Sequence, residues 1–82
     1  MMKPASQMVR DFREKRGVTQ THVAKQAGIT PQRLSQIETG LIRLTADELF
    51  KIVTEGFGVS LHIFFDEELS ENENSPAEPP ME

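Results

Sequence analysis

The sequence predicts an all-α fold of four helices, followed by one short β-strand. Apolar residues recur at helical spacing in four segments, most of which have a capping residue or a terminal glycine. Residues 59–65 instead place β-branched and aromatic side chains at a period of two. Residues 70–82 are rich in Glu, Asn, Ser and Pro and have little to bury. We therefore expect one domain over residues 1–69 and a disordered acidic tail over residues 70–82.

The first and last predicted helices supply most of the core. A helix over residues 4–16 has its apolar stripe on one face and ends at Gly17. Thr45 and Glu48 form a capping box that begins the last helix, which ends near Gly56. The apolar residues of these two helices are Ala5, Met8, Val9, Phe12, Leu49, Phe50, Ile52, Val53 and Phe57.

Two short helices joined by a tight turn are predicted over residues 19–40. Thr19 is a suitable N-cap for the first, and Val23, Ala24 and Ala27 form its small apolar face. Gly28 stands where the chain must take a left-handed conformation. Residues 30 and 31, Thr-Pro, then restart the chain as N-cap and first helical residue.

The second of these short helices divides its faces sharply. Leu34, Ile37 and Leu41 share one apolar stripe at 100° per residue. The opposite side lacks carboxylates and carries Gln32, Ser35, Gln36 and Thr39, with Arg33 on its flank. Glutamine can pair with adenine, and the arginine fork fits guanine. This pattern indicates a helix-turn-helix whose second helix enters the major groove. The alternative is an ordinary helical hairpin with a polar exterior.

The phrases VTQTHVAKQA and GITPQRLSQIETG resemble the helix-turn-helix of the Cro/phage-repressor family, also called the xenobiotic-response-element family. The resemblance implies a lambda-repressor-like domain that binds double-stranded operator DNA and represses transcription. It implies base contacts by Gln32 and Gln36 and phosphate contacts by Gln20 and Arg43. It further implies that Arg13 pairs with Glu38. The full predicted DNA-binding set is Gln20, Thr30, Gln32, Arg33, Ser35, Gln36, Thr39 and Arg43.

The predicted strand has Val59, Leu61, Ile63 and Phe65 on one face. Since no second strand is evident, its partner must come from another molecule, which predicts a homodimer. The alternative is a fifth helix. The phrases LFKIV and GVSLHIFF also resemble HipB-type antitoxins, a resemblance that implies such a strand-paired dimer and a HipA-type kinase toxin as partner. The recognition helix departs from that group at Gln32 and Arg33.

Composition limits the remaining classes of function. The formal net charge is −4, but all nine Lys and Arg lie before residue 52. With six acidic residues, positions 1–65 carry a net +3, and the other seven acids lie at residues 66–82. A basic body with an acidic tail is compatible with DNA binding. There is no cysteine, and the longest bulky apolar run is three residues, so we expect a cytoplasmic protein without membrane contact.

Catalysis is not expected, because His22 and His62 are the only histidines and no acid–base–nucleophile set shares a plausible pocket. No metal ion or cofactor is expected either. Three functions are consistent with the sequence. The first is a HipB-like antitoxin that represses its own operon and binds a kinase-like toxin. The others are a free-standing phage-type repressor and a protein–protein adaptor that does not bind DNA.

Overall fold

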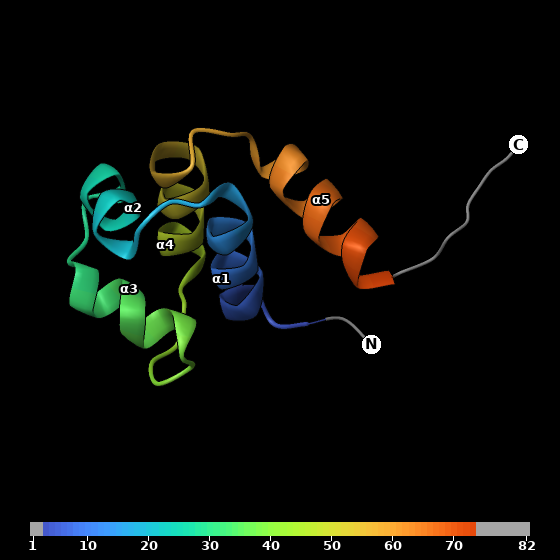
Figure 1. Ribbon diagram of the computed structural model, residues 1–82. Helices are drawn as coiled ribbons and strands as arrows, with labels where there is room; N and C mark the ends of the chain where they lie inside the picture. Colours follow the sequence, from blue (N-terminus) through green and yellow to red (C-terminus); the bar gives the residue numbers. More distant parts are fainter. Residues whose placement is uncertain (1–2, 74–82) are drawn as a thin grey trace, which may run out of the picture.

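The computed structural model describes residues 3–73 and arranges them as five α-helices and one π-helical turn (Figure 1). No described helix has the length and apolar character needed to cross a bilayer. The four helices expected from the sequence are confirmed. The elements are α1 Ala5–Arg16, α2 Gln20–Ala27, α3 Pro31–Glu38, α4 Ala46–Lys51, the π turn η1 Ile52–Gly56, and α5 Leu61–Glu73.

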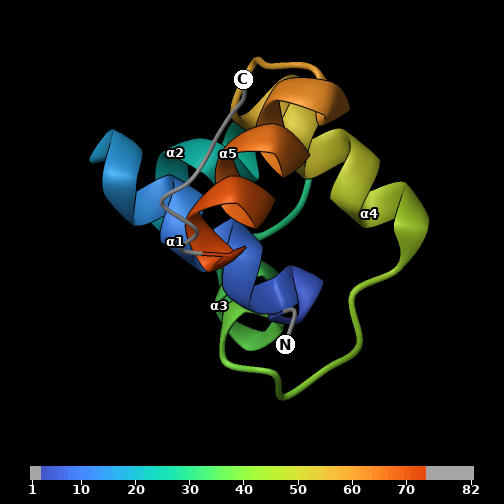
Figure 2. The same cartoon turned by 90° about the vertical axis from the view of Figure 1, so that its right-hand side faces the viewer.

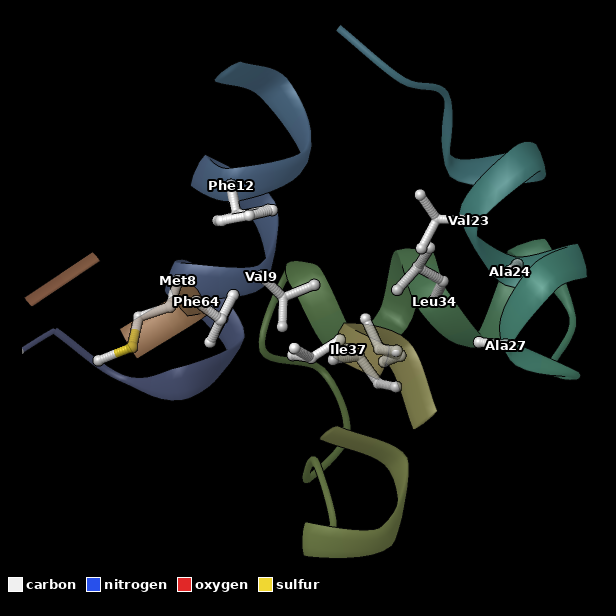
Figure 3. Packing of buried hydrophobic residues seen from close by; sticks show 11 residues of the cluster. Met8, Val9, Phe12, Val23, Ala24, Ala27, Leu34, Ile37 and Phe64 are labelled. Carbon is white, nitrogen blue, oxygen red and sulfur yellow. The ribbon is translucent and has the colours of Figure 1, made fainter. Parts of the chain in front are cut away.

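One apolar core joins all the helices, and Figure 3 shows side chains from α1, α2, α3 and α5 converging in it. Phe12 of α1 lies at its centre, with ring centroids 4.8 Å from Phe57 and 5.2 Å from Phe64. The buried hydrophobic residues are Met8, Val9, Phe12, Val23, Ala24, Ala27, Leu34, Ile37, Ile52, Val53 and Phe64. The core therefore fixes α2 and α3 against the rest of the chain.

Two predicted core residues lie outside the core. Leu41 comes three residues after the end of α3 and is 72% exposed, so it does not continue the stripe of Leu34 and Ile37. Phe50 on α4 is 54% exposed. Leu49, its neighbour, packs against the core instead.

The α4 helix continues directly into η1, which packs closely against α2. A Cβ placed on Gly56 would lie 2.9 Å from Val23 Cγ1 and 3.2 Å from the Val23 carbonyl oxygen. Only glycine permits this approach without a shift of one element. The close packing sets where α2 lies relative to α4 and η1.

We expect Gly56→Ala to lower the free energy of unfolding by about 1–3 kcal/mol, because the added methyl group overpacks the contact between η1 and α2. Chemical denaturation followed by circular dichroism measures this loss. Gly56 ends η1, and alanine there would otherwise raise stability by reducing the entropy of the unfolded chain. An unchanged or more stable variant would therefore contradict the close approach.

The predicted C-terminal strand is wrong, because residues 61–73 form α5. Ser60 begins this segment, and its Oγ accepts a hydrogen bond from the Ile63 backbone N–H at 3.2 Å. Phe64 is fully buried, and Leu61, Phe65 and Leu69 pack against the core at helical spacing. A helix satisfies its own backbone groups, so this segment needs no partner strand. The alternative of a fifth helix is confirmed.

Glu68 of α5 is fully buried between two lysines. Its carboxylate oxygens lie 3.0 Å from Lys3 Nζ and 2.7 Å from Lys15 Nζ. Lys3 also pairs with Asp11 of α1. Burial alone would lower the pKa of Lys3, but its pairing with the carboxylates of Asp11 and Glu68 outweighs burial and raises it. These ion pairs fix α5 along α1.

The described helix extends past the expected end of the domain. The predicted boundary after residue 69 lies within α5, which continues to Glu73. The rest of the predicted tail, residues 74–82, lies outside the described residues.

Candidate nucleic-acid interface

The capping residues that the sequence predicts begin both α2 and α3. Thr19 Oγ1 accepts a hydrogen bond from the His22 N–H, and Thr30 Oγ1 accepts one from the Arg33 N–H. Gly28, at φ +78°, reverses the chain between the helices. The Ile29 N–H then bonds the Ala24 carbonyl at 3.0 Å. This local hydrogen bonding sets the geometry of the helix pair.

The α3 helix turns one face into the core and a polar face outward. Leu34 and Ile37 are fully buried. Gln32, Arg33 and Thr39 are exposed, while Ser35 and Gln36 are half-buried. The predicted polar face is therefore present on α3, and Gln32 is its more exposed glutamine.

Glu38, the last residue of α3, is buried and held by side chains from two other helices. Arg13 of α1 donates from Nε to Oε2 at 2.8 Å and from Nη2 to Oε1 at 3.0 Å. Its Nη1 also donates to the Val18 carbonyl at 2.9 Å. Gln20 Nε2 donates to Oε1 of Glu38 at 2.9 Å. The predicted pair of Arg13 and Glu38 is confirmed, and it is part of a larger network.

Gln20 has a structural role that the sequence did not indicate. Its amide joins the first residue of α2 to the last residue of α3, so the two helices are tied at both ends of the motif. The only available signal was that the carboxylate of Glu38 can accept more bonds than one arginine fork supplies. The contact of Gln20 with a DNA phosphate stays a prediction.

Arg33 is held by a residue that sequence reasoning assigned only to a helix cap. Its Nε donates to Oε2 of Glu48 on α4. Oε1 of Glu48 accepts hydrogen bonds from the Thr45 N–H and hydroxyl, which completes the capping box. The bond from Arg33 lowers the pKa of Glu48; burial opposes this effect, and the Thr45 bonds assist it. The carboxylate therefore stays ionised at neutral pH.

The loop over residues 39–45 leads from α3 to α4, and Figure 2 shows it passing along the same end of the molecule as α3. The Gln36 carbonyl anchors its start by accepting from the Leu41 N–H at 2.9 Å and the Ile42 N–H at 3.3 Å. Arg43 is exposed on this loop. A cation is thus placed at the edge of the α3 surface.

Comparison with known proteins decides the family. The helix-turn-helix family matches residues 9–64, which is more than half of the chain. The chain belongs to the helix-turn-helix family. The expected resemblance to the Cro/phage-repressor type is thereby confirmed, and the protein is a DNA-binding transcriptional regulator.

Solved structures agree with this assignment. The wild-type restriction-modification controller protein C.Esp1396I is 28% identical, with a TM-score of 0.73, over 84% of this chain and 90% of that chain. Its tyrosine-to-alanine mutant gives 27% identity and a TM-score of 0.75 over 85% and 90% of the two chains. Its tyrosine-to-phenylalanine mutant is 26% identical, with a TM-score of 0.74, over 89% of this chain and 96% of that chain. No curated protein sequence matches significantly.

In this helix-turn-helix protein the exposed acids of the last helix lie away from α3. Figures 1 and 2 show α1 between α5 and α3. Asp66 and Glu67 are exposed on α5, and Glu67 pairs with Arg16 at 3.0 Å. Separating these acids from α3 reduces their repulsion of a phosphate backbone.

The helix-turn-helix surface brings together most of the predicted contact residues. Gln32, Arg33, Ser35 and Gln36 lie on α3, and Thr30 caps its start. Thr39 follows its end, where its hydroxyl donates to the Gln36 carbonyl at 3.2 Å. Their roles toward DNA stay predictions.

Proposed function

We propose that this protein binds a specific operator in double-stranded DNA as a homodimer, with α3 in the major groove. The observation that carries the proposal is the exposed face of α3, which offers glutamine and hydroxyl groups and no carboxylate. The one acid of α3, Glu38, faces inward and is neutralised by Arg13. A helix face with these polar groups and no carboxylate can pair with base edges without repelling the DNA phosphates.

The proposed contacts divide between bases and backbone. Gln32 and Gln36 lie about one helical turn apart on the same face of α3, so both side chains reach the same groove. Thr30, Ser35 and Thr39 flank them with hydroxyl groups that suit phosphate or base edges. Arg43, on the loop beside α3, supplies a cation for the backbone.

The proposed homodimer uses α5 in place of the expected strand. Val59, Leu61 and Phe65, three of the four predicted dimer residues, are partly buried against the chain's own core. Ile63 is 44% exposed on α5 and is left as an apolar contact for a second copy. A two-fold dimer would present two α3 helices to two half-sites, a spacing of about 34 Å or a multiple of it.

The HipB-like antitoxin role with a kinase-like toxin partner stays a prediction. This prediction depended in part on a C-terminal strand, and the structure has helix α5 in its place. The similarity to the restriction-modification controller protein supports an alternative setting, in which the chain regulates genes without a toxin partner. Co-purification of the chain with the product of the neighbouring gene separates these settings. A stable kinase-like partner would favour the antitoxin role.

Gln32→Ala and Gln36→Ala are each expected to cost about 1–3 kcal/mol of binding free energy on the specific operator and little on random DNA. The reason is that a lost base contact affects only the sequence it reads. Fluorescence anisotropy with the gene's own upstream region and a shuffled duplex measures both affinities.

Arg43→Ala is the matched control, because loss of a phosphate contact should weaken both duplexes alike and reduce the salt slope by about one. If Gln32→Ala weakens both duplexes equally, Gln32 does not read bases. Binding to neither duplex at low salt would instead leave the protein–protein adaptor as the better hypothesis.

A further inference from the structure

The ion pair of Arg33 and Glu48 connects the first turn of α3 with the first turn of α4. Arg33 follows Gln32 directly and belongs to the predicted DNA-binding set. Its side chain is 44% exposed, whereas that of Glu48 is 15% exposed. The carboxylate therefore lies on the protein side of the pair, and the guanidinium lies on the solvent side.

Glu48 is a well-anchored partner. Oε1 accepts from the Thr45 N–H at 3.2 Å and from the Thr45 hydroxyl at 3.1 Å. The Glu48 N–H in turn donates to Thr45 Oγ1 at 3.1 Å. The capping box thus fixes one carboxylate oxygen, and the other, Oε2, accepts from Arg33.

The contact uses the N–H group on Nε of Arg33 and does not use those on Nη1 and Nη2. A guanidinium has five N–H donors, and this bond employs one of them. The donors on Nη1 and Nη2 match the O6 and N7 acceptors of guanine in the major groove. Arg33 has also lost part of its side-chain freedom before DNA arrives, which lowers the entropic cost of a base contact.

We propose that Glu48 is a positioning residue that holds Arg33 toward a guanine of the operator. This inference rests on the proposed function of α3 and names one base that the site selects. The pairing has a second consequence. Because Glu48 offsets the charge of Arg33, it reduces the attraction of that guanidinium to phosphates of any sequence.

Selection of bound duplexes from a pool with a randomised operator tests the proposal, using the full chain. The wild-type protein should prefer guanine by about tenfold at one position of each half-site. Glu48→Gln should lose that preference, and its salt slope on random DNA should steepen by up to about one. Glutamine still supports a capping box, so the fold is retained and circular dichroism can verify it.

Two further variants make the result specific. Asp47→Asn changes the same charge in the same turn, without a contact to Arg33, and should keep the guanine preference. Arg33→Ala should lose the preference at the same position as Glu48→Gln, without a steeper salt slope. A combined variant should lose no more preference than Arg33→Ala alone, because both act through one contact.

Retention of the guanine preference in Glu48→Gln would overturn the positioning role and leave Glu48 as a helix cap. Retention in Arg33→Ala would overturn Arg33 as the reader. A wild-type protein that selects no sequence at all would overturn the proposed function as well, so the two failures are distinguishable.

Discussion

Glu38→Ala is expected to lower the free energy of unfolding by about 3–5 kcal/mol, because it leaves the guanidinium of Arg13 partly buried without its partner. Arg13 donates two bonds to Glu38, and Gln20 donates a third. All three donors would have to find water in a site that the helices close. A loss of this size is a large fraction of the stability of a small domain.

Urea denaturation followed by circular dichroism measures the effect, and the chain offers a matched control. Glu14 pairs with Arg10 at 3.4 Å on the exposed side of α1. Glu14→Ala removes the same charge and should cost no more than about 1 kcal/mol, since water screens an exposed pair. A similarly small loss for Glu38→Ala would show that its carboxylate is not needed in the core.

Replacing both Arg13 and Glu38 separates the cost of an unpaired buried charge from the cost of losing the hydrogen-bond network around Glu38. The double variant Arg13→Leu with Glu38→Met removes the unpaired charge and fills the space with apolar groups. We expect it to recover much of the stability that Glu38→Ala loses. It should still lose the tie to Gln20, so its α2–α3 motif is expected to bind the operator more weakly than wild type.

The helix pair and its polar face could be predicted because their determinants are local. Thr19, Thr30 and Thr45 each cap the helix that follows, and each bond spans three residues. The pairing of Glu38 with Arg13 was implied by the family resemblance, and both hydrogen bonds of that pair are present. Short-range capping and helical periodicity therefore gave most of the candidate interface.

The C-terminal helix was mistaken for a strand because Val59, Leu61, Ile63 and Phe65 alternate at a period of two. Leu61, Phe64 and Phe65 already fit helical spacing, but the next inward position is Glu68. An apolar residue there would have extended the helical pattern. The cations that pair with Glu68 are Lys3 and Lys15, which are far away in sequence, so the pattern alone could not reveal the burial.

The contact of Arg33 with Glu48 could not be inferred for a related reason. Fifteen residues and a loop separate the two side chains. Glu48 already had a sufficient local explanation as the third residue of a capping box. Only the folded structure shows that its second carboxylate oxygen accepts a hydrogen bond from Arg33 of α3.

Ile63→Lys is expected to convert the proposed dimer into a folded monomer and to weaken operator binding by about 10²–10⁴-fold, the usual gain from linking two binding modules. Ile63 is exposed on α5, so a lysine there does not disturb the monomer core. Two like charges facing each other across a two-fold axis would oppose association. Sedimentation at micromolar concentration and operator titration measure the two effects.

His62→Lys is the control, because it adds the same charge at the neighbouring exposed position without removing the apolar contact. We expect it to remain dimeric and to bind the operator as wild type does.

A fully dimeric Ile63→Lys would place the subunit contact elsewhere. Leu41 and Phe50 are the other large exposed hydrophobic residues of the described chain, at 72% and 54% exposure. Charge substitutions at those two positions would then locate it, since a contact at Leu41 would bring the partner beside α3 itself.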